Sequence, residues 1–101
     1  MSPVERRLYR LSPNQLRALL ELAKTKEGII VATQTASHLK KKGKALGGIF
    51  SSLSRQVING EHLVTPWGRS ADGYGLRWKL NTKLISKDRV LQITKELLEI
   101  Y

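Results

Sequence analysis

The chain has 101 residues, enough for one domain with a modest core and too few for a large internal ligand cavity. Hydrophobic residues (41%) and charged residues (26%) occur in globular proportions, and without cysteine the chain has no disulfide, thiolate nucleophile or cysteine-bound zinc. The net charge of +10 predicts attraction to a polyanion, either nucleic acid or an anionic membrane surface.

Two capping motifs occupy the start of the chain. Ser2-Pro3-Val4-Glu5 and Ser12-Pro13-Asn14-Gln15 both fit a capping box, in which the Ser accepts from the N3 amide and Glu or Gln reaches back. Leucines and an alanine follow the second motif at helical spacing, which predicts a helix over about 13–26. Residues 3–11 fit either a helix or an extended segment against the body.

Three further elements are predicted between Gly28 and Gly60, a stretch that contains no Asp or Glu. The β-branched run at 28–31 predicts a short edge strand, and a second helix is expected over about 34–41. A third helix is expected over about 44–58, ended by Asn59-Gly60. The buried stripe of this third helix would be Leu46, Phe50, Leu53 and Val57.

The opposite face of the third helix carries small and basic residues. These are Lys44, Gly47 or Gly48, Ser51, Ser52, Arg55 and Asn59. Two consecutive glycines inside a helix cost roughly 1 kcal/mol each relative to alanine, so another interaction should offset that cost. Either the helix packs closely on a neighbour, or its backbone approaches a groove floor or a phosphate.

The last third of the chain predicts a β-hairpin and a terminal helix. A strand at 63–65 ends at Pro66, and a loop at 67–75 precedes an alternating strand at 76–80. Trp67 at the loop entrance would either cover the edge of the core or stack on a sugar or base. The helix from about 86 to 101 has an apolar stripe wider than one small body needs, so we expect a homodimer through it.

This order of elements resembles the winged helix-turn-helix superfamily. The resemblance covers about residues 12–82 and depends on element order, chiefly from Thr33 to Leu80, and the terminal helix resembles that of MarR-like and related small dimeric regulators. It implies an α+β fold, in which a three-helix core and a small antiparallel sheet with its wing are followed by a C-terminal helix. Residues 1–101 would then form a single winged-helix domain.

The resemblance also implies a double-stranded DNA-binding protein, a transcriptional regulator with helix 44–58 in the major groove and wing 67–75 on the minor groove or backbone. Arg55 has the shape to grip guanine, whereas Lys44, Ser51 and Ser52 can bond bases or phosphates. Candidates for phosphate contacts lie at the start of the second helix, in the turn after it and in the wing. They are Thr33, Gln34, Thr35, Lys40, Lys41, Lys42, Arg77 and Lys79, together with Arg69, which can contact either the minor groove or a phosphate.

The sequence contains no catalytic pattern. His38 and His62 have no carboxylates at metal-binding spacing, and Gly43-Lys44 lacks the rest of a phosphate-binding loop. We therefore expect neither an enzyme nor a cofactor. No run is apolar for long enough to span a bilayer, so we expect a cytoplasmic, nucleoid-associated protein without a membrane partner. The alternatives are a non-specific architectural or RNA-binding winged helix, and a protein-interaction adaptor with the same fold.

Overall fold

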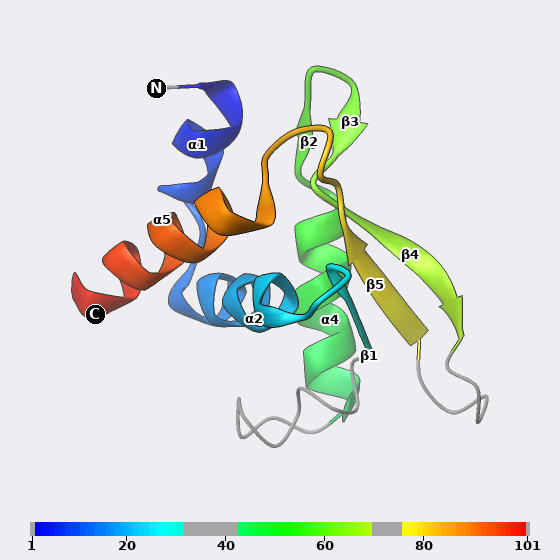
Figure 1. Ribbon diagram of the computed structural model, residues 1–101. Helices are drawn as coiled ribbons and strands as arrows, with labels where there is room; N and C mark the ends of the chain where they lie inside the picture. The colour runs from blue at the N-terminus through cyan, green and yellow to red at the C-terminus, as the bar shows by residue number, and fades with distance from the viewer. Residues whose placement is uncertain (1, 32–42, 70–75, 101) are drawn as a thin grey trace.

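The structure, a computed structural model, describes residues 2–31, 43–69 and 76–100 (Figure 1). This part of the chain has an α+β fold with four helices, α1 (Pro3–Leu8), α2 (Pro13–Lys24), α4 (Gly43–Ser54) and α5 (Lys87–Ile100). Its strands are β1 (Ile29–Val31), β2 (Val57–Ile58), β3 (Glu61–His62), β4 (Val64–Arg69) and β5 (Leu76–Leu80). They form an antiparallel sheet of order β1-β5-β4 and a separate β2-β3 hairpin. The predicted helix at 34–41 lies outside the described residues.

The second capping motif is confirmed, and it begins α2. The Gln15 amide donates to Ser12 Oγ over 3.2 Å, and the Ser12 amide donates to Gln15 Oε1 over 2.9 Å. Only one of the two hydrogen bonds of a capping box forms at the first motif. Ser2 Oγ accepts from the Glu5 amide over 3.2 Å, but the Glu5 carboxylate accepts from Arg89 on α5 over 2.8 Å. Residues 3–8 are helical, which decides between the two forms that the sequence left open.

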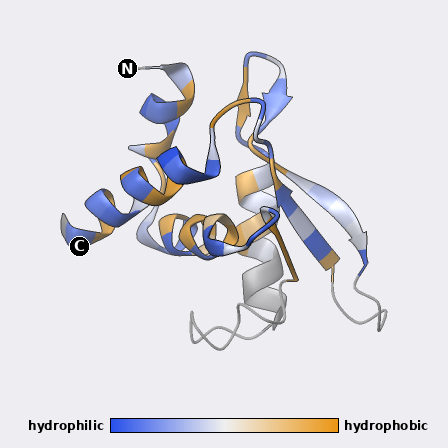
Figure 2. Cartoon of the chain, viewed as in Figure 1, coloured by the Kyte–Doolittle hydropathy of each residue, from blue (hydrophilic) through white to orange (hydrophobic). Residues whose placement is uncertain are grey.

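The core lies where α2 and α4 meet the inner face of the sheet. Phe50 of α4 stacks on Trp78 of β5, with ring centroids 6.0 Å apart and an interplanar angle of 16°. Both rings are buried, as are the leucines of α2. Figure 2 shows hydrophobic and hydrophilic bands alternating along α2 and α5, as amphipathic helices require.

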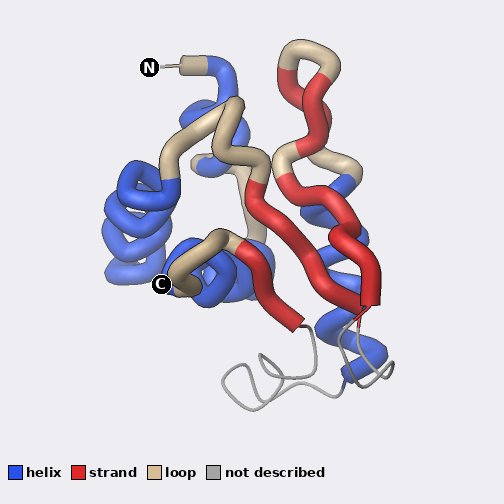
Figure 3. Tube along the Cα trace, turned by 45° about the vertical axis from the view of Figure 1, so that its right-hand side comes forward, coloured by secondary structure: helices blue, strands red, loops and turns tan. Residues whose placement is uncertain are grey.

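The terminal helix α5 packs on α2 and α1 of its own chain (Figure 3). Val90, Ile93 and Leu97 are buried, and Leu91 and Leu98 are half-buried against the same core. No large hydrophobic side chain among the described residues of α5 is exposed. The described part of the apolar stripe from which a homodimer was expected is therefore covered internally, and the oligomeric state stays a prediction.

The third helix is shorter than predicted, because α4 ends at Ser54 and residues 57–62 form the β2-β3 hairpin. Asn59 (φ 54°) and Gly60 (φ 80°) make a two-residue turn, the arrangement that Asn-Gly favours most strongly. Val57, predicted in the buried stripe, is 40% exposed, whereas Ile58 is buried. His62 Nδ1 donates to the Ser54 carbonyl over 2.6 Å and holds the hairpin against the end of α4.

Strand β4 is longer than predicted and includes Pro66, which was expected to end it. Because β4 is an edge strand, the missing amide of Pro66 need not interrupt the ladder. Residues 67–69 of the predicted loop therefore belong to β4, and residues 70–75 lie outside the described part. Strand β5 alternates as predicted at Trp78 and Leu80, although Leu76 is 38% exposed.

Candidate functional site

Strands β4 and β5, the edge and central strands of the three-stranded sheet, form a pair that we call the ribbon, and it presents basic side chains on its outer face. Lys79 lies opposite Thr65 in the ladder, and its ammonium is 4.0 Å from the centre of the Trp67 ring. Such a cation–π contact is worth about 0.5–1 kcal/mol at an exposed site. Trp67 is 45% exposed, so it does not cover the edge of the core, the first of the two roles that the sequence allowed.

A bulge shapes the far part of this ribbon. Between the pairs Pro66–Trp78 and Arg69–Leu76, two residues of β4 oppose the single Arg77 of β5. Gly68 occupies the bulge with φ 78°, a conformation that L side chains rarely adopt. An added Cβ at Gly68 would lie 3.4 Å from Nη2 of Arg77, so the guanidinium packs directly on this glycine.

The ribbon's positive charge is not compensated within the described residues. Neither β4 nor β5 contains Asp or Glu, and Arg69 is exposed. The ion pairs in the described part are Lys24–Glu21 and Arg89–Glu5, and neither involves the ribbon. Arg77 Nε is buried, and no described group bonds to it. Within the described residues the ribbon therefore carries three cations and no acid.

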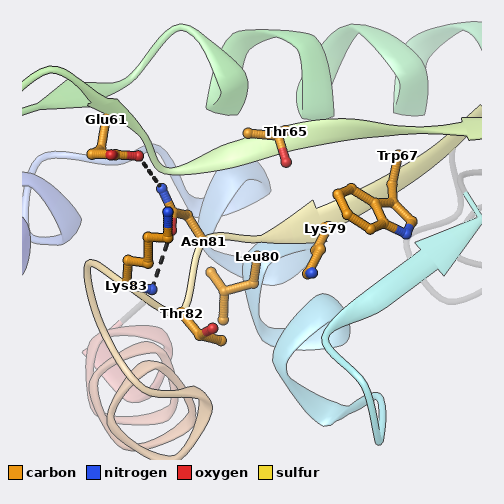
Figure 4. A pocket seen from close by; sticks show the side chains of 8 residues that line it. All are labelled: Glu61, Thr65, Trp67, Lys79, Leu80, Asn81, Thr82 and Lys83. Carbon is orange, nitrogen blue, oxygen red and sulfur yellow. Dashed lines mark hydrogen bonds between the residues drawn. The ribbon is translucent and has the colours of Figure 1, made fainter.

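An open hollow of about 330 Å³ lies beside Lys79 (Figure 4). It is lined by Glu61, Thr65, Trp67, Lys79, Leu80, Asn81, Thr82 and Lys83. Asn81 is fixed at one end, because its Nδ2 donates to Glu61 Oε2 (3.0 Å) and its Oδ1 accepts from the Lys83 amide (3.1 Å). Trp67 and Lys79 form the other end. In the described ranges, no three His, Cys, Asp or Glu residues gather as a metal site.

Helix α4 leaves open space at Gly48. This glycine is exposed, and a Cβ built on it would meet no described atom within 4 Å. Of the two accounts of the glycine pair, close packing is therefore wrong at Gly48. The room outside the helix would let another molecule approach its backbone.

Two predicted residues of the outward face lie elsewhere. Ser52 is turned toward α2, where its hydroxyl accepts from Gln15 Nε2 over 3.0 Å and donates to the Ile49 carbonyl over 2.7 Å. Arg55 is exposed but follows the last residue of α4, since the hairpin ends the helix early. Ser51 stays on α4 and is half-buried.

Seven other candidates lie wholly or partly outside the described part of the chain. Lys44 belongs to the first turn of α4, but its side chain is outside that part. The remaining six are outside it entirely, namely Thr33, Gln34, Thr35, Lys40, Lys41 and Lys42.

Sequence reasoning missed the pairing of Trp67 with Lys79 and three arginines on and beside α1. The Trp67–Lys79 contact depends on the strand register, which a hairpin with a bulge does not reveal in sequence. The arginines, Arg6, Arg7 and Arg10, line a second hollow of about 160 Å³. Their signal was visible as three arginines within five positions, with Glu5 the one acid in the first twenty residues.

Comparisons with known protein families, with curated proteins and with solved structures give no match to this chain. Among the described residues no helix is both long and apolar enough to cross a membrane.

Proposed function

We propose that this chain binds double-stranded DNA as a winged helix-turn-helix regulator, with α4 toward the major groove and the β4-β5 ribbon on the flanking backbone. The proposal depends mainly on the three cations of the ribbon, which have no acidic partner among the described residues. Arg77 and Lys79 lie on its outer face, and Arg69 pairs with Leu76 on the other face. A polyanion is the partner that such a face attracts most strongly.

The order of the elements supports the same proposal. Helix α2 precedes β1, α4 precedes β4, and the first strand pairs with the last in the order β1-β5-β4. This order is compatible with a winged helix in which β4-β5 is the wing. Open space at Gly48 on α4 adds a place where a phosphate or base edge can come close to the helix backbone.

The spacing of the wing cations suits a phosphate chain. Arg77 and Lys79 are two residues apart on one face of β5, which separates their Cα atoms by about 7 Å along the strand. They can therefore bind different phosphates. Trp67 holds the Lys79 ammonium on the outer face, so less side-chain freedom is lost when a phosphate binds.

The test is a titration of a 20-base-pair duplex at several salt concentrations. Arg77→Gln/Lys79→Gln removes two wing cations, and Lys24→Gln/Lys95→Gln removes the same charge from α2 and α5. We expect the wing variant to reduce the log–log salt slope by about two units, at about 0.9 per phosphate contact, and the control to retain it. Equal slopes in both variants would refute the wing contact.

A second candidate, binding of single-stranded RNA or DNA, is favoured by the exposure of Trp67. Base stacking on an aromatic ring contributes about 1–3 kcal/mol per base. Trp67→Leu should then weaken single-strand binding and leave duplex binding nearly unchanged. Tighter binding of a single strand than of the duplex at one salt concentration would favour this candidate. Binding of neither would favour the protein-interaction adaptor.

A further inference from the structure

Three arginines gather around the short helix α1. Arg6, Arg7 and Arg10, which we name the α1 arginine surface, line the open hollow of about 160 Å³ together with Pro3. Arg6 and Arg10 are exposed, and Arg7 is half-buried. The lining contains no aromatic ring and no large apolar side chain that would hold the ring of a small ligand. It is a surface for charge.

The charge of this surface is not neutralised by the described residues. Glu5 is the nearest acid in sequence, but its carboxylate accepts from Arg89 Nε over 2.8 Å. That hydrogen bond lowers the pKa of Glu5, so the carboxylate stays ionised and engaged with α5. Arg6 and Arg7 lie in the last turn of α1 and Arg10 follows the helix, so three like charges stand within five positions and repel one another. An external anion would relieve the repulsion.

One arginine of the surface is held in place. Arg7 Nη1 donates to Gln56 Oε1 over 2.9 Å, which uses one of its five N–H groups. Gln56 is itself fixed through its backbone, because its backbone amide donates to the Leu53 carbonyl and its backbone carbonyl accepts from the Leu63 amide. Arg55, the residue before Gln56, is also exposed.

Helix α1 and the far ends of β4 and β5 lie toward opposite ends of the described part of the chain. Figures 1 and 3 both show α1 on the side of the molecule where α4 leads into β2, whereas the end of β4 and the beginning of β5 lie toward the start of α4. A segment of phosphate backbone that contacts only Arg77 and Lys79 would therefore leave the α1 surface unoccupied.

We propose that the α1 arginine surface binds the phosphate backbone of a second nucleic-acid segment, so that one chain can bridge two duplexes. The proposal rests on the DNA binding proposed above. Arginine suits this ligand because its planar guanidinium can donate two parallel hydrogen bonds to a phosphate. A continuous phosphate chain can also contact several arginines at once, which one small anion cannot do in an open hollow.

A bridging assay tests the proposal with the full chain. A biotinylated 20-base-pair duplex is fixed on beads, and a fluorescent duplex is retained only if the protein binds both. Arg6→Gln/Arg10→Gln changes two exposed side chains of the surface, and Lys24→Gln/Lys95→Gln is the control of equal charge. We expect the arginine variant to retain at least tenfold less of the second duplex, while its binding to one duplex falls less than twofold. The control should bridge like the unaltered chain.

The outcomes separate the two proposals. The second site is overturned if the unaltered chain binds one duplex but does not bridge, or if the arginine variant bridges as well as the unaltered chain. Either result leaves the DNA-binding function intact. Bridging that persists in Arg6→Gln/Arg10→Gln would instead come from two chains that each use the wing. If neither duplex binds at low salt, both proposals fail. Polyglutamate is added as a competitor at the same total charge as free duplex. If both displace the second duplex equally well, the partner of the surface would be any acidic polymer and not nucleic acid in particular.

Discussion

Replacing Gly48 by alanine should make the fold more stable and DNA binding weaker. A Cβ at this position would meet no described atom within 4 Å, and the residue lies inside α4. Alanine is favoured over glycine in a helix interior by about 0.5–1 kcal/mol, partly because the unfolded chain has less freedom with alanine. Since the added methyl group meets no described neighbour, no steric cost in the folded state offsets this gain.

The expected gain is measurable by urea denaturation. With a slope of about 1–3 kcal/mol per molar urea for a small domain, a gain of about 1 kcal/mol moves the midpoint by about 0.3–1 M. The thermal midpoint should rise by about 4–8 °C for the same gain. Gly60→Ala serves as the control, because its surroundings are also open but its φ of 80° is left-handed. We expect that variant to be destabilised by about 1–2 kcal/mol.

Duplex titration of Gly48→Ala provides the second measurement. If α4 approaches the backbone or base edges at this point, the added methyl group separates the surfaces and weakens binding. A lower urea midpoint would show that Gly48 is packed and would refute the reasoning. A higher midpoint with unchanged affinity would show that DNA does not approach the helix there.

Three further changes test the fold. Ser12→Ala removes the cap of α2 and should cost about 1 kcal/mol by urea denaturation, unless the Gln15 contact alone suffices. Glu5→Gln should destabilise the chain at neutral pH: the Arg89 hydrogen bond lowers the pKa of Glu5 in the folded state, so its stabilisation is present above the unfolded pKa and lost as pH falls through the folded pKa. Urea midpoints of both chains should therefore converge in acid, and a constant difference would argue against the ion pair. Truncation after residue 83 removes the buried residues of α5, each worth about 1.5–3 kcal/mol, and circular dichroism should show an unfolded chain; a folded monomer would instead support α5 as a dimerisation element.

The elements that sequence predicted well are those governed by local chemistry. The capping box at Ser12 and Gln15 lies within four residues, so no distant contact is needed to form it. The alternation around Trp78 and Leu80 follows directly from the two-residue period of a strand. The α+β class follows from these elements together.

The end of the third helix could be predicted only by weighing two local signals against each other. Val57 continues a helical stripe. Asn59-Gly60, which lies between Val57-Ile58 and Glu61-His62, is instead typical of the turn of a hairpin. The hairpin forms because Asn59 and Gly60 both adopt positive φ, which a helix does not contain. Ile58 then takes the buried position instead of Val57.

The candidate site was less predictable because it depends on contacts between distant elements. Periodicity assigns Ser52 to the outward face of its helix. Its hydroxyl nevertheless contacts Gln15, because α2 packs against α4 at that position. Trp67 reaches Lys79 through the register of β4 and β5, which includes a bulge at Gly68. Neither the crossing nor the bulge has a sequence signal that outweighs the simpler pattern.

The early end of α4 also changes what Arg55 should do. In a helix running to residue 58 this side chain would face a major groove, but it follows Ser54 and lies beside Gln56, which bonds Arg7. Recognition helices contact base edges mainly with their N-terminal residues, and Arg55 is at the other end of α4. We therefore expect Arg55→Ala to weaken a preferred and a random duplex equally and to reduce bridging, as a phosphate contact would. A loss of about 1–3 kcal/mol confined to the preferred duplex would instead assign base reading to Arg55.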